Sequence, residues 1–276
     1  MTDIQEFGYA GKRVLVVGGA TGMGAAAAKG AAALGAEVVV FDRVAVDYPV
    51  AAAITVDLRD RAALDAAIDQ VGGPVDAVFS AAGISQGPAT VTINFIAHRH
   101  LIERMTGEGT LRPGSAVCLI SSVAGLGWQN HLELLTDFLA APDFEAAGKW
   151  VDEHEGSNTY TFSKQAINAY VARAAYPMMA KGIRINAICP GPTDTPLARA
   201  EGWLDGFGAD YRQAVGSAPL VPEQMATVML FLNSPAARGI SGVSLLVDDG
   251  HIMSSIGGSW EPGGPVIKFL MEDTSR

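Results

Sequence analysis

Residues 14–24 read Val-Leu-Val-Val-Gly-Gly-Ala-Thr-Gly-Met-Gly, and this stretch decides the fold. Its apolar run ends in glycines, and an alanine-rich stretch of helical character (25–34) follows. A second apolar run then occupies residues 38–41 and ends at Asp42. Apolar runs bounded by glycine, with a helical stretch between them, predict a strand, a turn, a helix and a second strand. Such a unit is the building block of a parallel sheet covered by helices.

Three glycines in this unit have distinct expected roles. Gly18 allows a tight turn out of the first strand, and Gly22 allows backbone to approach a pyrophosphate. Gly24 lets the helix pack closely on the sheet, while the helix N-terminus attracts phosphates. Asp42 stands 18 residues beyond Gly24, where a carboxylate can accept hydrogen bonds from an adenosine ribose. The pattern predicts a dinucleotide site, and a glycine-rich turn that binds nothing is the alternative.

Further strand candidates recur along the chain with helical segments between them. They occupy residues 13–18, 38–42, 53–57, 77–80, 116–121, 184–189 and 243–247. This alternation predicts an α/β fold, a Rossmann-type doubly wound parallel sheet of about seven strands with helices on both faces. No repeat or linker interrupts the chain, so residues 1–276 are expected to form a single domain. Ligands of such sheets bind beyond the carboxyl ends of the strands.

The bulk composition disfavours several classes of function. The formal net charge of −10 argues against binding to nucleic acid or to anionic membrane surfaces. No apolar run is long enough to span a membrane, and the N-terminus lacks a secretory signal, so a cytoplasmic protein is expected. Cys118 and Cys189 lie in apolar runs and are expected to be buried thiols, not a disulfide. The five histidines show no ligand spacing, and no metal site is expected.

Tyr160-Thr-Phe-Ser-Lys164 is the candidate chemical centre. The i, i+4 spacing places a phenol and an ammonium close together on one helix face. A neighbouring cation stabilises a phenolate, so we expect Lys164 to lower the pKa of Tyr160 from its usual value of about 10. A tyrosine tuned in this way can act as a general acid and base near neutral pH.

Over essentially its whole length, the chain resembles the short-chain dehydrogenase/reductase family. The matching motifs occur in the family's order: Gly18-x-x-x-Gly22-x-Gly24, Ala82-Gly83, Ser122, Tyr160-x-x-x-Lys164 and Pro190-Gly191-x-x-x-Thr195. The resemblance implies the doubly wound fold and a nicotinamide cofactor. It also implies hydride transfer between the C4 atom of that cofactor and an alcohol or ketone.

The chain departs from the family pattern at three places. After the strand at 77–80 the family usually has Asn-Asn-Ala-Gly, whereas this chain has Ser80-Ala81-Ala-Gly. Val17 stands where a threonine is common, and Asp249 replaces a glycine. Small residues at 81–83 still let backbone lie against a cofactor, but the side-chain bonding of the usual asparagines is missing.

The resemblance assigns roles to four catalytic residues. It implies that Tyr160 moves the hydroxyl proton and that Lys164 lowers the pKa of Tyr160 and bonds the nicotinamide ribose. It implies that Ser122 fixes the carbonyl oxygen and that Asn94 holds a relay water. The residues alone leave alternatives: Asn94 could be a structural amide that kinks its helix, and Ser122 a loop hydroxyl bonded to local backbone, as Ser121 is expected to be.

The resemblance also implies the set of residues that contact the cofactor. They are Gly18, Thr21, Gly22, Met23, Gly24, Asp42, Arg43, Asp57, Leu58, Ala81, Ala82, Gly83, Tyr160, Lys164, Pro190, Gly191, Thr193 and Thr195. Asp57 would contact the adenine amino group, or it would be the N-cap of a helix over residues 60–70. We predict NAD as the cofactor because the Asp42 carboxylate would repel the 2′-phosphate of NADP, although Arg43 could offset part of this repulsion.

A helical insert precedes Tyr160. Ser122 and Tyr160 are 38 residues apart, against about a dozen in most of the family, and the extra residues are 129–159. Two amphipathic pieces are separated by Pro142, with apolar stripes at Leu135/Phe138/Leu139 and Phe144/Ala147/Trp150/Val151. With the short connection at 43–52, the insert resembles the 3α-hydroxysteroid dehydrogenase/carbonyl reductase branch. It could be a substrate lid, or a helical pair packed on the body or on another subunit.

The sequence therefore predicts an NAD-dependent dehydrogenase that interconverts a secondary alcohol and a ketone. We expect a mainly apolar, ring-containing or otherwise bulky substrate. The insert, residues 194–217 with Trp203, Phe207 and Tyr211, and the tail 251–276 with Met253, Trp260 and Phe269 would enclose it. A reductase of 3-oxoacyl thioesters and a catalytically silent NAD-binding regulator are the alternatives. A homo-oligomer, dimer or tetramer, is expected.

Overall fold

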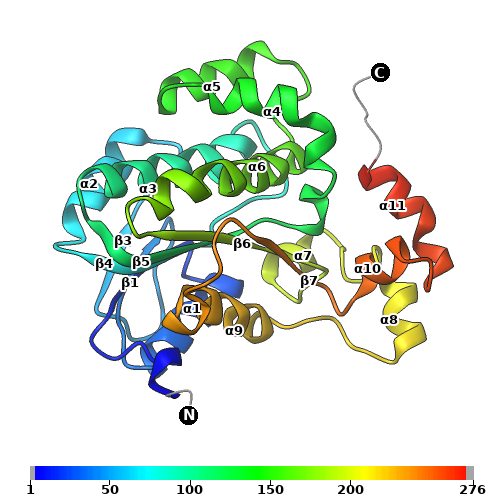
Figure 1. The fold of residues 1–276 in the computed structure, drawn as a ribbon, viewed down its shortest axis with the longest axis horizontal. Helices are drawn as coiled ribbons and strands as arrows, with labels where there is room; N and C mark the ends of the chain where they lie inside the picture. Colours follow the sequence, from blue (N-terminus) through cyan, green and yellow to red (C-terminus); the bar gives the residue numbers. More distant parts are fainter. Residues whose placement is uncertain (1–3, 272–276) are drawn as a thin grey trace.

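Seven strands form one parallel sheet in the order β3-β2-β1-β4-β5-β6-β7. The computed structural model describes residues 4–271, and Figure 1 shows the sheet between two layers of helices. The strands are β1 (Arg13–Val17), β2 (Glu37–Asp42), β3 (Ala52–Thr55), β4 (Val75–Ser80), β5 (Leu111–Ile120), β6 (Arg184–Pro190) and β7 (Ser244–Val247). This arrangement confirms the predicted Rossmann-type, doubly wound α/β fold.

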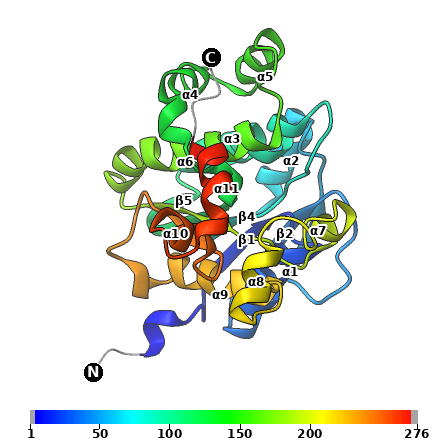
Figure 2. The same cartoon turned by 90° about the vertical axis from the view of Figure 1, so that its right-hand side faces the viewer.

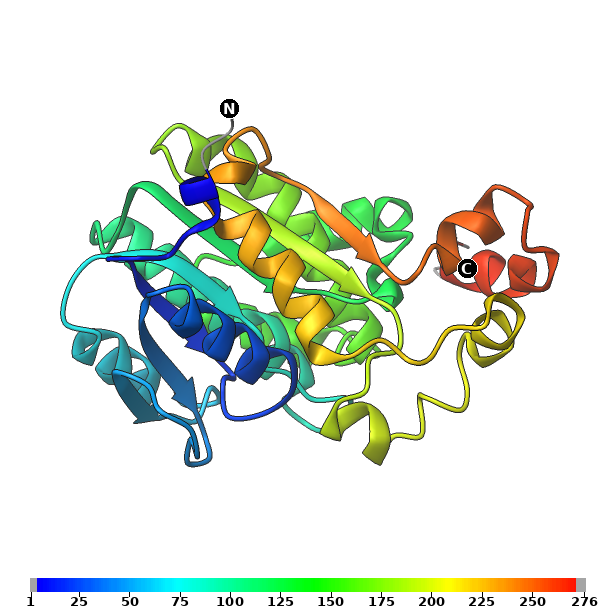
Figure 3. The same ribbon diagram turned by 90° about the horizontal axis from the view of Figure 1, so that it is seen from below.

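The helices cover both faces of the sheet. They are α1 (Gly22–Ala33), α2 (Arg61–Gln70), α3 (Ala97–Gly107), α4 (Leu132–Leu139), α5 (Phe144–Glu153), α6 (Tyr160–Met179), α7 (Pro196–Ala200), α8 (Ala209–Val215), α9 (Pro222–Asn233), α10 (His251–Ile256) and α11 (Gly264–Met271). Helices α1 and α9 lie side by side on one face, and α2, α3 and α6 lie on the other (Figures 1 and 3). Because both faces are covered, most residues of the central strands β1 and β4 are buried and apolar.

The strand order reverses at β1, and this reversal positions the site. Val14 of β1 pairs with Val38 of β2 on one side and with Ala77 of β4 on the other. The chain winds outward through β2 and β3, then returns to β4 and winds the opposite way through β7. Connections leaving β1 and β4 therefore diverge and open a crevice beyond their carboxyl ends, the usual ligand position in such sheets.

Helix α1 begins at Gly22, three residues earlier than the alanine-rich stretch suggested. Thr21 is its N-cap, with extended backbone at φ −142° and ψ 173°. Glycine disfavours a helix by its propensity, so sequence alone places the start too late. Packing of the first turn against the sheet overrides this propensity.

The insert forms the two helices expected of it, and their apolar stripes are buried except at Phe144, which is partly buried. Leu135 and Phe138 on α4 and Ala147 on α5 have 1% exposure or less. The Phe138 ring lies 5.3 Å from Phe162 of α6 and 5.5 Å from Phe95, measured between ring centroids. Helices α4 and α5 therefore form a further layer over α6 and extend the core of the body (Figure 1).

Polar contacts also fasten the insert to the body. Arg99 of α3 donates through Nη2 to the Ala141 carbonyl oxygen at 2.9 Å, between α4 and α5. Arg61 of α2 pairs with Glu145 of α5, with 2.5 Å between Nε and Oε1. Of the expected alternatives, these contacts support a helical pair packed on the body and give no support to a hinged lid.

The C-terminal segment lies beyond the carboxyl ends of the strands, beside α8 (Figure 2). Tyr211 of α8 stacks on His251 of α10 at 4.8 Å and meets Trp260 at 5.5 Å, while its hydroxyl donates to the Asp249 carbonyl oxygen at 2.9 Å. Asn130 donates to the carbonyl oxygen of Met271, which fastens α11 to the start of the insert. The expected role of Phe269 concerns a side chain outside the described residues.

Asp249, which replaces a glycine of the family pattern, has a left-handed backbone. Its φ is 55°, and it is the only non-glycine residue with positive φ among the described residues. Glycine adopts this conformation without strain, and aspartate is one of the few other residues that tolerate it. The backbone turn after β7 is therefore compatible with Asp249, although the family pattern has a glycine there.

Candidate active site

A groove of about 410 Å³ lies beyond the carboxyl ends of β1, β2 and β4, at the N-terminus of α1. Its lining includes most of the residues that the sequence assigns to the cofactor: Gly18, Thr21, Gly22, Met23, Gly24, Asp42, Arg43, Asp57, Leu58, Ala81, Ala82, Gly83 and Thr195. Several further lining residues are not identifiable from the motifs, among them Val44, Arg59, Ile84, Pro196 and Leu197.

Three glycines shape the floor of the groove. A Cβ atom on Gly18, whose φ is 82°, would overlap the backbone of Ala82, and one on Gly24 would overlap the carbonyl oxygen of Gly18. Gly22 has a φ of 58° and faces Thr195, whose Cγ2 would lie 3.6 Å from an added Cβ. Bare backbone at a helix N-terminus suits a pyrophosphate, so the residues present fit a dinucleotide cofactor.

Asp42 is fixed at the end of β2. Its Oδ2 accepts a hydrogen bond from the Ala20 amide at 2.9 Å, and its Oδ1 accepts one from the Val44 amide at 3.2 Å. Each carboxylate oxygen can still accept another hydrogen bond. The carboxylate therefore faces the groove in a fixed orientation, where a ribose hydroxyl could donate to it.

Asp57 lines the same groove but pairs with Arg59, with 2.5 Å between Oδ2 and Nη2. The hydrogen bond from Arg59 lowers the pKa of Asp57. The N-cap of α2 is Asp60, whose Oδ1 accepts from the Ala63 amide at 3.0 Å. The alternative that Asp57 caps this helix is therefore wrong, because Asp60 occupies that position.

The loop after β6 approaches the groove only at its end. Gly191 bonds to the Val247 carbonyl oxygen at 2.9 Å, and Thr193 donates to the Gly191 carbonyl oxygen at 3.0 Å. Pro190, Gly191 and Thr193 follow the sheet edge and are not part of the groove lining. Thr195 caps α7 by accepting from the Ala198 amide at 3.1 Å and lines the groove beside Gly22.

Helix α6 brings the catalytic candidates together. Thr159 caps the helix, and Tyr160 is its first residue. Lys164 is 4% exposed, its Nζ donates to the Ile120 carbonyl oxygen at 2.8 Å, and it lies 5.3 Å from the centroid of the Tyr160 ring. Ser122 accepts from the Ala124 amide at 3.1 Å and is also hydrogen-bonded to Tyr160. Ser122 thus makes a hydrogen bond to local backbone, as the alternative interpretation expects, and it also contacts the phenol.

The pKa of Tyr160 differs from the sequence-based expectation. Burial raises this pKa, and the hydrogen bond to Ser122 opposes the rise. Burial also lowers the pKa of Lys164 to about 8. The expectation that Lys164 gives the phenol a depressed pKa is wrong for the chain alone. Loss of solvation disfavours the charged form of each group.

Asn94 lies in the π-helical turn η2 (Thr92–Ile96), which precedes α3. Its Oδ1 accepts from the Ile84 amide at 2.8 Å, and its Nδ2 donates to the Ile84 carbonyl oxygen at 2.9 Å and to Ser163 Oγ at 3.0 Å. The side chain therefore has the structural role of holding the loop after β4 against α6. The proton-relay role stays a prediction.

His98 holds the loop after β4, a position that the motifs did not reveal. Its Nε2 bonds the Ala82 carbonyl oxygen at 3.0 Å, and its Nδ1 bonds Ser80 Oγ. A carbonyl can only accept, so Nε2 carries the hydrogen and Nδ1 accepts from Ser80. Burial lowers the pKa of His98 to about 4, which keeps it neutral. The family usually has asparagines where this chain has Ser80 and Ala81, and here His98 supplies side-chain hydrogen bonds to this loop. The sequence offers one hint of this role, because His98 follows Asn94 by four residues, a spacing that places side chains on the same helix face.

Aromatic side chains adjoin the catalytic group. The Trp203 ring, in the segment after α7, lies 5.3 Å from the Tyr160 ring between centroids. Phe207 lies 5.1 Å from His251, so this segment and the C-terminal segment pack together. Met253 is 57% exposed and the insert packs elsewhere, so of the three expected segments the one with Trp203 is seen to contact the phenol.

The described residues also limit other kinds of site. Cys118 and Cys189 are free and buried. Within residues 4–271 there is no group of three or more His, Cys, Asp or Glu side chains placed to hold a metal ion. No helix in that range combines the length and apolar character needed to cross a bilayer.

Family models match two parts of the chain. The model described as the NAD dependent epimerase/dehydratase family matches residues 14–188, and the model described as enoyl-(acyl carrier protein) reductase matches residues 149–251. The first covers the glycine-rich turn and the second the strand-end loop after β6. Both matches fit the nucleotide groove and the catalytic helix described above.

Curated relatives align over most of the chain. A coniferyl-alcohol dehydrogenase from Pseudomonas sp. is 26% identical, over 87% of this chain and 96% of the relative. A 3-alpha-hydroxysteroid dehydrogenase/carbonyl reductase from Comamonas testosteroni is 28% identical, over 86% and 95%. A cis-4-hydroxycyclohexanecarboxylate dehydrogenase from Sinomonas cyclohexanicum is 28% identical, over 88% and 97%.

The chain belongs to the short-chain dehydrogenase/reductase family. It is an oxidoreductase, and its cofactor is a nicotinamide dinucleotide. A solved 3-alpha-hydroxysteroid dehydrogenase from Pseudomonas sp. B-0831 in complex with NADH shares the fold, with a TM-score of 0.71, 23% identity and coverage of 90% and 98%. A short chain dehydrogenase from Burkholderia cenocepacia in complex with NADP has a TM-score of 0.64 at 25% identity, covering 87% and 97%.

The role of His98 is tested by His98→Leu. Removing the imidazole leaves the Ser80 hydroxyl and the Ala82 carbonyl without their partner and loosens the cofactor loop. We expect NADH to bind about tenfold more weakly, the effect of one lost buried hydrogen bond, with a smaller change in kcat. Fluorescence titration with NADH measures the affinity. His98→Gln, which can still donate to Ala82, should recover part of it, and unchanged affinity in His98→Leu would contradict the role.

Proposed function

We propose that this enzyme interconverts a secondary alcohol and a ketone with NAD. The observation that carries the proposal is the cluster of Ser122, Tyr160 and Lys164, which adjoins the dinucleotide groove. A phenol bonded to a serine hydroxyl can exchange a proton with a substrate oxygen held between the two. The bound nicotinamide supplies the hydride acceptor or donor, and the chain supplies orientation and acid–base groups.

Each residue of this cluster has a separate task. Ser122 holds the substrate oxygen and already has the Ala124 amide to fix its own position. Tyr160 takes the proton during oxidation and returns it during reduction. Lys164 is held by the Ile120 carbonyl oxygen and presents its charge to the ribose and to the phenol. Bound substrate and cofactor exclude water from this corner, which strengthens these electrostatic interactions.

Tyr160→Phe is expected to lower kcat about 10²–10⁴-fold, because it removes the proton-transferring group. NADH affinity should stay within a factor of about two, since the ring and its packing remain. Tyr176→Phe is the matched control, because Tyr176 is on the same helix and is 84% exposed. Lys164→Ala should reduce both turnover and NADH binding. Near wild-type turnover by Tyr160→Phe would rule out the proposed proton transfer.

We propose NAD, not NADP, on the basis of charges at the adenosine end of the groove. The Asp42 carboxylate is held in the groove by the Ala20 and Val44 amides, and it would repel the 2′-phosphate of NADP. Two arginines line this end, but Arg59 is paired with Asp57. Arg43 is exposed, so solvent screens its attraction for a phosphate.

Catalytic efficiency with NAD is therefore expected to exceed that with NADP by at least about tenfold, the effect of an unfavourable charge pair in a half-buried site. Asp42→Asn should narrow this ratio because it removes the repulsion, and Asp47→Asn nearby is a control. Steady-state kinetics with both cofactors give the ratio. Equal efficiency with NAD and NADP in the unmodified enzyme would refute the preference.

For the substrate, we propose an apolar, ring-containing secondary alcohol or ketone. Trp203 gives an aromatic wall beside the Tyr160 phenol, and large aromatic surfaces favour apolar rings without demanding particular hydrogen bonds. The names of two relatives point the same way, as a hydroxysteroid and a hydroxycyclohexanecarboxylate dehydrogenase. The acidic net charge of −10 argues against docking of an acidic acyl carrier, the alternative source of substrate.

Kinetics on a size series of neutral alcohols test this substrate class. We expect efficiency to rise from small linear to cyclic secondary alcohols, and Trp203→Ala to lower it about tenfold for the cyclic members, as the loss of a large apolar contact does. Small linear alcohols should be affected less. An efficiency that peaks at small linear alcohols, or turnover confined to 3-oxoacyl thioesters, would overturn the assignment.

A further inference from the structure

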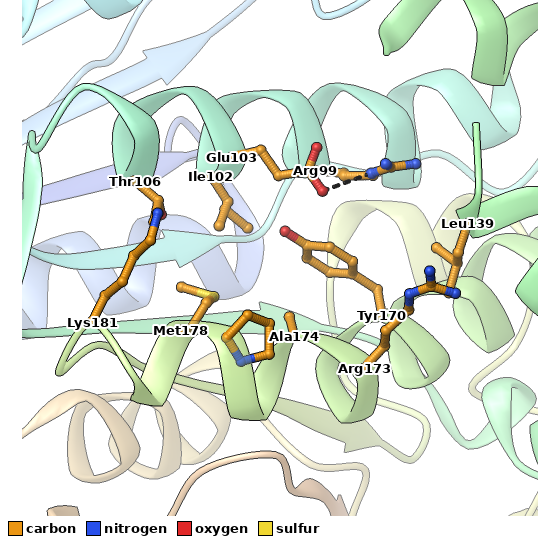
Figure 4. A pocket seen from close by; sticks show the side chains of 11 residues that line it. Arg99, Ile102, Glu103, Thr106, Leu139, Tyr170, Arg173, Ala174, Met178 and Lys181 are labelled. Atoms are coloured by element: carbon orange, nitrogen blue, oxygen red, sulfur yellow. Dashed lines mark hydrogen bonds and ion pairs between the residues drawn. The ribbon is translucent and has the colours of Figure 1, made fainter. Parts of the chain in front are cut away.

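A second pocket, of about 360 Å³, lies between α3 and α6 at the edge of the insert and shares no residue with the cofactor groove. Figure 4 shows side chains from both helices pointing into it, with Leu139 of α4 at one end. No part of the proposed reaction uses these residues. Tyr170 lies ten residues after Tyr160 on α6, which is about 15 Å along a helix.

Arg99 lines this pocket and has one guanidinium nitrogen that makes no hydrogen bond to the described residues. Its Nε donates to Glu103 Oε1 at 2.9 Å, and its Nη2 donates to the Ala141 carbonyl oxygen at 2.9 Å. Its Nη1 is buried and has no hydrogen-bond partner in the described part of the chain. The side chain is only 11% exposed, so the guanidinium is held rigidly. A fixed, desolvated N–H without an acceptor is costly, which makes a bound acceptor favourable.

Two hydroxyls accompany this nitrogen. Tyr170 is 6% exposed, and Figure 4 shows its phenol oxygen pointing across the pocket toward α3. This oxygen makes no hydrogen bond to another described residue. Thr106 Oγ1 is buried and equally without a partner among residues 4–271. Buried polar atoms usually have hydrogen-bond partners, so two such unpaired atoms beside one cavity, Arg99 Nη1 and Thr106 Oγ1, favour a ligand there.

The pocket is positively charged, although the chain carries a net charge of −10. Its lining has three cations (Arg99, Arg173 and Lys181) and one carboxylate, Glu103, a balance of three positive charges against one negative. Glu103 is already paired with Arg99, and neither Arg173 nor Lys181 forms an ion pair with another described residue. The site therefore attracts an anion.

The rest of the lining is apolar. Ile102, Leu139, Ala174, Pro177 and Met178 form it, and the volume lies at the lower end of the range for small-molecule sites. An anion with an apolar body matches this combination better than a hydrated phosphate does. A single negative charge also suits the pocket better than a double one, because Glu103 stays close to the ligand.

We propose that this pocket binds a small organic monocarboxylate with an apolar chain or ring. One carboxylate oxygen accepts from Arg99 Nη1, and the other accepts from the Tyr170 hydroxyl. The apolar body lies on Ile102 and Met178, and Arg173 and Lys181 screen the charge at the rim. Because Arg99 also holds the Ala141 carbonyl, an occupied pocket stabilises the junction between α3 and the insert.

Calorimetric titration of the full chain with octanoate, without cofactor, tests the proposal. A ligand of about ten non-hydrogen atoms is expected to bind with a Kd of about 0.1–1 mM. Octanamide, equal in shape but neutral, should bind at least about tenfold more weakly. Tyr170→Phe should weaken octanoate binding about fivefold to tenfold with unchanged melting temperature, the effect of losing one hydrogen bond to a charged group. Tyr176→Phe should change nothing.

Other outcomes overturn the site. Equal binding of octanoate and octanamide would show that only apolar contact matters. Octanoate affinity unaltered in Tyr170→Phe, or lost on saturation with NADH, would place the ligand elsewhere. No binding up to about ten times the expected Kd, together with a change in oligomeric mass in Arg173→Glu, would show that a second copy covers the face. Basal alcohol oxidation should be unaltered in Tyr170→Phe.

Discussion

The structure depends on one close approach of backbone to backbone. Gly18 leaves β1 against the backbone of Ala82, and Gly24 in the first turn of α1 lies against the carbonyl oxygen of Gly18. A single methyl group at either position would separate β1, α1 and the end of β4. This contact keeps the N-terminus of α1 at the crevice that the reversal of strand order opens beyond β1 and β4. Glycine is needed here for space at least as much as for its dihedral angles.

The buried ammonium of Lys164 connects the end of β5 to the catalytic candidates on α6. Lys164 is almost wholly removed from water, and its bond to the Ile120 carbonyl oxygen at the end of β5 offsets part of the desolvation cost. Its neighbours Tyr160 and Ser122 lie at the start of α6 and just after β5. Two elements that already pack together thus set the geometry of the site. The pKa shifts of Tyr160 and Lys164 share the same cause, because burial disfavours the charged form of each.

Sequence reasoning succeeded where the signal is local. Apolar runs ending in glycine predicted the strands, and the glycine spacing predicted the groove at the end of β1, since both depend on neighbouring residues. It failed where burial decides. The neutral state of His98 between Ser80 and Ala82 and the raised pKa of Tyr160 both depend on burial, which residue spacing does not give. Catalytic roles, the single-domain reading and the oligomeric state stay predictions.

The insert separates Ser122 from Tyr160 in sequence without separating them in space. The insert begins after the turns that follow β5 and ends at Thr159, the N-cap of α6, so its length does not alter the serine–tyrosine contact. Its apolar side chains extend the core over α6, where Phe138 packs on Phe162, two residues after Tyr160. Added core on the outer face of the catalytic helix restricts the motion of that helix. The extra residues are therefore better explained as support for a rigid site than as a moving cover.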